Sequence, residues 1–104
     1  MIQYDVYVGY GGRSNAADSF TELGGFALGL GLHGFTAFDA VGGWESAVGE
    51  QVYEPIKVFR FILDVTERVT LPPWPVLVFV SHAKFLLQQE AVLVTQTEVN
   101  RWGI

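Results

Sequence analysis

The fold is decided by an alternating stretch at the start of the chain, Ile2-Gln-Tyr-Asp-Val-Tyr-Val-Gly-Tyr10. The residues expected on one side of this stretch are all apolar or aromatic: Ile2, Tyr4, Val6, Val8 and Tyr10. A period of two is typical of a strand that buries one face. We therefore expect a half-buried strand that begins the fold.

Further elements follow at short spacing. Ser19-x-x-Glu22 matches a capping box, which predicts a helix start. A helical stripe is formed by Val76, Phe79, Val80, Ala83 and Leu87, although the residues around Val76 also have strand composition. After the first strand we expect a helix, two strands joined by a hairpin turn, a second helix and a last strand, over residues 19–34, 35–41, 50–65, 76–89 and 90–99.

The resulting order, β-α-β-β-α-β, predicts a ferredoxin-like α+β fold. Residues 1–104 are expected to form one domain, because a second core of useful size would not fit. The fold places both helices on one face of a four-stranded antiparallel sheet. The other face is left bare, with apolar groups that favour a partner, so we expect a homo-oligomer.

Composition disfavours several classes of function. Six Lys and Arg against eleven Asp and Glu give a net charge of −5, whereas duplex-binding proteins concentrate positive charge. There are no cysteines, so disulfides and thiol catalysis are excluded. The apolar stretch over residues 23–38 is shorter than the ~20 residues that a membrane span needs. We expect a cytoplasmic protein that binds neither duplex nucleic acid nor membrane.

The sequence contains no recognisable catalytic motif. His33 and His82 are the imidazoles available as bases, and neither lies in a known motif. Glu45, Glu50 and Glu54 surround one hairpin without a histidine, which favours solvated carboxylates over a metal site. We therefore expect no cofactor, no metal and no enzymatic activity.

One group of residues predicts a ligand site. Aromatic rings stack on bases, and arginine binds phosphates through its planar fork. Such groups could line a nucleotide pocket at a subunit junction, or could instead be interface core and surface ion pairs. The candidate ligand-binding residues are Trp44, Tyr53, Lys57, Arg60, Gln88, Arg101 and Trp102.

Two resemblances bear on function. The stretch from Gly34 to Trp44, followed by Glu50 or Glu54 and by Lys57-Val58, is similar to a hairpin of the domain-of-unknown-function 3574 family, which implies no activity. Tyr7-Val-Gly9, the Gly43-Trp44 pair and the stretch from Gln89 to Val94 resemble small phage proteins of the first Thoeris anti-defence family. That resemblance implies an oligomeric sponge that sequesters cyclic-ADP-ribose-type immune signals without cleaving them.

Three hypotheses follow. The first is a non-enzymatic oligomeric module that binds a small ligand, such as a nucleotide-derived immune signal, in the manner of a phage anti-defence sponge. The second is a protein–protein inhibitor or adaptor that uses its acidic surface. The third is an α+β-barrel monooxygenase-like or isomerase-like enzyme that uses His33 or His82.

Overall fold

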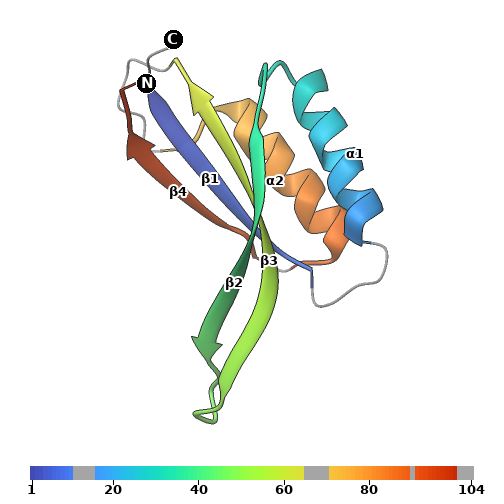
Figure 1. Cartoon of the computed structure of the whole chain (residues 1–104), viewed down its shortest axis with the longest axis vertical. Helices are drawn as coiled ribbons and strands as arrows, with labels where there is room; N and C mark the ends of the chain where they lie inside the picture. Colours follow the sequence, from blue (N-terminus) through green and yellow to red (C-terminus); the bar gives the residue numbers. More distant parts are fainter. Residues whose placement is uncertain (11–15, 65–70, 90, 101–104) are drawn as a thin grey trace.

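The computed structural model describes residues 1–10, 16–64, 71–89 and 91–100 of the chain. The elements are β1 (Ile2–Gly9), α1 (Ala16–Gly29), β2 (Thr36–Glu45), β3 (Gln51–Leu63), α2 (Trp74–Leu87) and β4 (Leu93–Glu98). The four strands form one sheet in the order β2-β3-β1-β4, with every neighbouring pair antiparallel. Both helices cover the same face of this sheet (Figure 1). The predicted ferredoxin-like fold is therefore confirmed.

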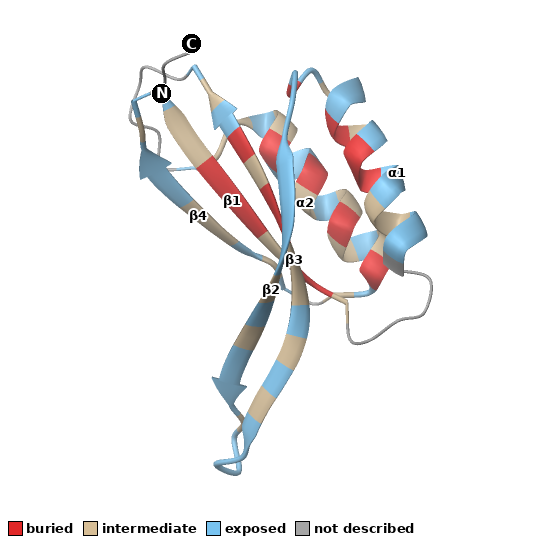
Figure 2. Cartoon of the chain, in the orientation of Figure 1, coloured by how far each residue is buried: buried red, intermediate tan, exposed pale blue. Residues whose placement is uncertain are grey.

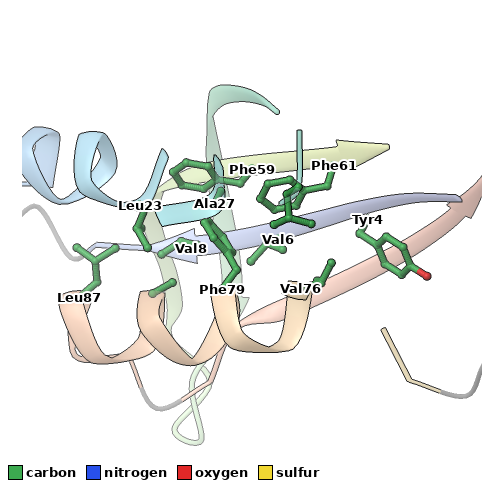
Figure 3. Close-up of a cluster of buried hydrophobic side chains, with 12 residues drawn as sticks. Tyr4, Val6, Val8, Leu23, Ala27, Phe59, Phe61, Val76, Phe79 and Leu87 are labelled. Carbon is green, nitrogen blue, oxygen red and sulfur yellow. The ribbon is translucent and has the colours of Figure 1, made fainter. Parts of the chain in front are cut away.

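The core lies between the sheet and the helices. Tyr4, Val6 and Val8 of β1 are fully buried, as the alternation predicts, and Figure 3 shows them within the cluster of buried side chains. They pack with Phe59 and Phe61 of β3. Burial raises the pKa of the Tyr4 phenol above its ordinary value, so this hydroxyl stays neutral in the core.

The second helix buries four of the five residues of its predicted stripe, and the fifth, Val80, is partly buried against the core. Val76, Phe79, Ala83 and Leu87 are its buried residues. The helix begins with Trp74 and carries a proline in its first turn, where the missing N–H group costs no hydrogen bond. The long apolar run around Val76 is therefore helical, and its buried face is the one expected from a period of 3.6 residues.

The boundaries predicted for α1 are wrong. The helix already includes Ala16, so Ser19 and Glu22 lie inside it and do not form a capping box. It ends before Gly34, because Gly31 adopts a positive φ of 80°. There the Leu32 N–H group donates to Ala27 O and the Gly31 N–H group to Leu28 O, a pattern that closes a helix at glycine.

The β2–β3 hairpin is longer than the rest of the sheet. Pairing of β1 with β3 ends at Gly9 and Ile56, whereas β2 and β3 stay paired out to Glu45 and Gln51. The hairpin therefore projects beyond the helices, and its projecting end contains no fully buried residue (Figures 1 and 2). Pro55 lies in this part, where β3 has lost β1 as a neighbour, which agrees with the edge position expected for a strand proline. Gly42 and Gly43 pair in register with Glu54 and Tyr53, so these two glycines form no bulge.

We predict opposite effects for two neighbouring glycines of α1. A Cβ atom on Gly24 would lie 2.7 Å from Phe35 Cζ, whereas a Cβ atom on Gly25 would meet nothing within 4 Å. Gly25→Ala should therefore raise the free energy of unfolding by about 0.5–1 kcal/mol, since alanine is the better helix former. Gly24→Ala should lower it by about 1–2 kcal/mol through overpacking. Urea denaturation of both variants checks this, and equal effects would contradict the packing described.

Candidate functional site

A hollow lies at the base of the projecting hairpin. This hairpin pocket has a volume of about 690 Å³, which falls in the range of small-molecule sites. It is bounded by β1, by both strands of the hairpin and by the segment that leads into β4. Its lining residues are Tyr7, Gly9, Ala40, Val41, Gly42, Gly43, Trp44, Glu54, Ile56, Gln89, Ala91, Val92 and Leu93.

Most of this pocket belongs to the sheet face that the helices leave bare. Gly42 pairs with Glu54, and Gly9 pairs with Ile56, and paired residues of antiparallel strands project to the same side. Tyr4, Val6 and Val8 project to the helical side, so Gly9 and its partners project to the bare side. The pocket is therefore the hollow between the projecting hairpin and the beginning of β4.

Two glycines make room for this hollow. A Cβ atom on Gly9 would lie 2.6 Å from Glu54 Oε1, and one on Gly42 would meet the side chain of Ile56. The absence of these Cβ atoms lets the Glu54 carboxylate lie against the backbone of β1. Close backbone approach is the usual reason for glycine inside a strand.

Glu54 is the single charged residue among the described residues that line the pocket. Its carboxylate makes no hydrogen bond and no ion pair with any described residue. The other polar groups are neutral: the Tyr7 hydroxyl accepts a hydrogen bond from Thr95 Oγ1 at 3.2 Å, and the Gln89 amide donates to Leu87 O at 3.2 Å. The pocket thus combines one unpaired negative charge with apolar walls.

Trp44 supplies an aromatic surface to the pocket. About half of its side chain is exposed (49%), so the indole keeps a free surface on which a planar ring could stack. Glutamine and tyrosine side chains on the other walls can donate to or accept from such a ring. The composition suits a heteroaromatic ligand that carries positive charge.

The structure brings few of the predicted site residues together. Trp44 lines the pocket, but Tyr53 pairs with Gly43 and lies on the opposite side of the hairpin. Gln88 is the exposed left-handed C-cap of α2, and it is the next residue, Gln89, that lines the pocket. Arg101 and Trp102 lie outside the described residues.

Both described cations of the predicted site are engaged in ion pairs. Arg60 Nε and Nη2 donate to the two oxygens of Asp5 at 2.9 and 3.0 Å, and the guanidinium lies 5.0 Å from the ring centroid of Phe38. Hydrogen bonding to Asp5 raises the pKa of Arg60 above its ordinary value. Lys57 faces the helical side, 3.0 Å from Asp39 Oδ1 and 5.2 Å from the Phe20 ring centroid. Neither cation reaches the hairpin pocket.

The two histidines do not share a site. The His82 ring stacks on Phe26 at 4.0 Å between the helices, with Nε2 3.7 Å from Glu22 Oε1. His33 lies in the turn that precedes β2.

Within the described ranges no group of three or more acidic, histidine or cysteine side chains is placed to hold a metal ion. No helix of these ranges has the length and apolarity to cross a membrane.

Residue Glu54 could not be chosen from the sequence as the charged group of the pocket. Three hairpin glutamates looked equivalent, and only the strand register places Glu54 on the bare face beside Gly9. The sequence feature that indicates the pocket is a pair of glycines directly before an aromatic residue within a strand, Gly42-Gly43-Trp44.

Two solved structures share this fold. A phage SAM lyase in complex with S-methyl-5'-thioadenosine matches with a TM-score of 0.67 and 17% identity, over 93% of this chain and 80% of that chain. A DUF3240 family protein from Shewanella baltica matches with a TM-score of 0.50 and 10% identity, over 99% and 94% of the two chains. No protein-family model matches the chain, and no curated protein matches its sequence. Identities this low establish the fold alone.

These comparisons bear on two expectations, the lack of enzymatic activity and the resemblance to phage anti-defence sponges. The expectation of no enzymatic activity is wrong as an inference from missing motifs, because an enzyme, the phage SAM lyase, has this fold. The resemblance to phage anti-defence sponges holds in a coarser sense: a phage protein that binds a small ligand shares the fold. The specific sponge family is not supported by a matching family model.

We predict that the two ion pairs differ in their contribution to stability. The Asp5 side chain is 8% exposed and that of Asp39 77% exposed. Asp5→Ala should lower the free energy of unfolding by about 1–3 kcal/mol, less than for a fully buried pair because Arg60 is partly solvated. Asp39→Ala should change it by less than about 0.5 kcal/mol. Thermal and urea denaturation of the two variants measure this, and a larger loss for Asp39→Ala would contradict it.

Proposed function

We propose that this chain binds a cationic adenosine derivative of the S-adenosylmethionine class in the hairpin pocket and cleaves it there. The observation that carries the proposal is the unpaired Glu54 carboxylate as the single charged lining residue of an otherwise apolar pocket. A carboxylate held among apolar walls favours a ligand that brings positive charge, because burial of an unpaired charge is costly. A sulfonium centre is such a charge.

The remaining walls suit the nucleoside part of that ligand. The Trp44 indole can stack on an adenine ring, an interaction worth about 1–3 kcal/mol. Tyr7 and Gln89 offer neutral hydrogen-bonding groups for ring nitrogens or ribose hydroxyls. The volume of about 690 Å³ leaves room for a nucleoside with an amino-acid chain.

The same charges argue against a polyphosphate ligand such as an ADP-ribose-type signal. A bound pyrophosphate needs cationic or backbone donors. Arg60 and Lys57 are paired elsewhere, and no cation is present among the described lining residues. The pocket therefore supports a sulfonium nucleoside over a nucleotide signal.

Cleavage of such a ligand requires one bond to break. The carbon–sulfur bond breaks with both electrons going to sulfur, so that S-methyl-5'-thioadenosine leaves as a neutral thioether. The carbon that loses sulfur regains an electron pair in one of two ways: a neighbouring C–H bond gives its proton to Glu54 and its electrons to a new carbon–carbon double bond, or the fragment's own carboxylate oxygen bonds to this carbon and closes a ring. Positive charge disappears from sulfur as the bond breaks, and apolar walls favour a reaction in which charge is lost. The fold of the phage SAM lyase supports this assignment.

Glu54→Gln tests the role of the carboxylate. The variant should weaken binding of S-adenosylmethionine by at least about 10-fold, because a partly desolvated charge pair is worth about 1–3 kcal/mol. Binding of the neutral S-methyl-5'-thioadenosine should change by less than about 3-fold. Isothermal titration measures both affinities, and liquid chromatography with mass spectrometry follows the release of S-methyl-5'-thioadenosine.

Glu50→Gln is the matched control for this experiment. Glu50 is exposed at the tip of the same hairpin and does not line the pocket, so this variant removes the same charge without touching the ligand. Equal losses in the two variants would attribute the effect to net charge and overturn the assignment of Glu54. Tighter binding of ADP-ribose than of S-adenosylmethionine by the unaltered protein would overturn the ligand class.

We also propose that the chain forms a homo-oligomer through the projecting hairpin. Val48 and Tyr53 are exposed by 81% and 69%, and exposed apolar groups of this size favour a protein contact. Native mass spectrometry should show a multiple of the single-chain mass. Tyr53→Asp should shift the protein toward the monomer, because a charge on this surface would have to be desolvated. A monomer in the unaltered protein would contradict the proposal.

A further inference from the structure

A second, smaller pocket lies at the other end of β2. It has a volume of about 290 Å³ and is lined by residues 32–36, Arg60 and Ile62. Thr36 lines this pocket, and Ala40, four residues further along β2, is the nearest β2 residue of the hairpin pocket, which separates the two linings by about 13 Å at about 3.3 Å per residue. This arginine pocket is therefore separate from the hairpin pocket.

Arg60 enters the arginine pocket in a fixed orientation. Its Nε and Nη2 atoms are held by the two oxygens of Asp5, and the Phe38 ring lies beside the guanidinium. This contact uses one edge of the planar group. The other edge, formed by Nη1 and the second Nη2 proton, has no partner among the described residues. That edge can bind a carboxylate through two parallel hydrogen bonds.

His33 faces the same pocket from a strained turn. Its φ is 57°, in the left-handed region, and the Gly34 N–H group donates to Leu32 O across it at 2.6 Å. A three-residue turn with positive φ at its centre is rare and strained. Glycine would adopt this conformation at lower cost, yet the position carries an imidazole that lines the pocket. Strain of this kind is concentrated at functional sites.

The remaining lining groups define the ligand further. Thr36 pairs with Arg60 across β2 and β3 and adds a hydroxyl donor on the same side. Phe35 and Ile62 are 37% and 38% exposed and form apolar walls. The pocket thus has three polar side chains that can donate hydrogen bonds, beside a surface that suits a short hydrocarbon chain.

We infer that the arginine pocket binds a small organic monocarboxylate, with its carboxylate on Arg60, His33 and Thr36 and its apolar part on Phe35 and Ile62. Asp5 compensates part of the Arg60 charge, so a singly charged carboxylate fits better than a doubly charged phosphate. This site is independent of the proposed function, because none of its lining residues lines the hairpin pocket.

Butyrate and its neutral isostere butyramide test the inference. Both are titrated into the folded protein and followed by amide chemical shifts in ¹H–¹⁵N NMR spectra. Butyrate should shift the amides of residues 33–36 and bind at least about 5-fold tighter than butyramide. The amides of Gly42 and Gly43, at the hairpin pocket, should not shift. Equal affinities, or shifts confined to the hairpin pocket, would overturn the inference.

Three variants assign the effect to the named residues. Asp5→Asn combined with Arg60→Gln replaces the ion pair by an amide pair and should weaken butyrate binding at least 10-fold. Lys57→Gln removes one cation that faces the helical side and should leave it unchanged. His33→Gly relieves the strained turn, so it should raise Tm while weakening butyrate binding about 3-fold. If the double variant does not fold, His33→Gly decides the question: a raised Tm with unchanged butyrate affinity would overturn the inference.

Discussion

The architecture depends on a difference in length between neighbouring strands. β1 stops pairing with β3 at Gly9, while β2 and β3 continue together to the hairpin turn. The two-stranded end is not covered by α1 and α2 and projects from the body (Figure 1). A hollow lies where the third strand ends. Gly9 lies at this corner and admits the Glu54 carboxylate. The position of the pocket is thus a consequence of sheet geometry.

Charge is distributed unevenly over the described part of this acidic chain. Arg60 and Lys57 are each held by an aspartate from a neighbouring strand, which leaves the Glu54 carboxylate as the uncompensated charge of the hairpin pocket. The pocket at the other end of β2 has the opposite character, with an arginine and a histidine in its wall. The two ends of one strand therefore present different chemistry to small molecules.

The sequence predicted the order of elements and the buried faces of β1 and α2. A buried face requires apolar residues at a regular spacing, and this spacing remains visible even when single residues depart from it. It did not predict the limits of α1, since Ser19 and Glu22 match a capping box that the helix, starting at Ala16, does not use. It selected Trp44 but also Tyr53, which adopts the opposite side of the hairpin. The side of the hairpin on which a residue lies depends on the strand register, and the register is determined by the two paired strands together.

Enzymatic activity was excluded because the sequence contains no catalytic motif. A site formed by residues far apart in the sequence, however, gives no such motif.

The central place of β1 has a consequence for how the chain is made. β1 leaves the ribosome before its two neighbours, β3 and β4, which end at Leu63 and Glu98. Its two edges stay open until β3 and β4 have been made, and open strand edges favour pairing with other chains. Asp5, at the middle of this strand, gains its Arg60 partner only when β3 arrives. Until then an unpaired carboxylate lies in a strand that is largely buried in the folded protein, where it opposes premature association of nascent chains.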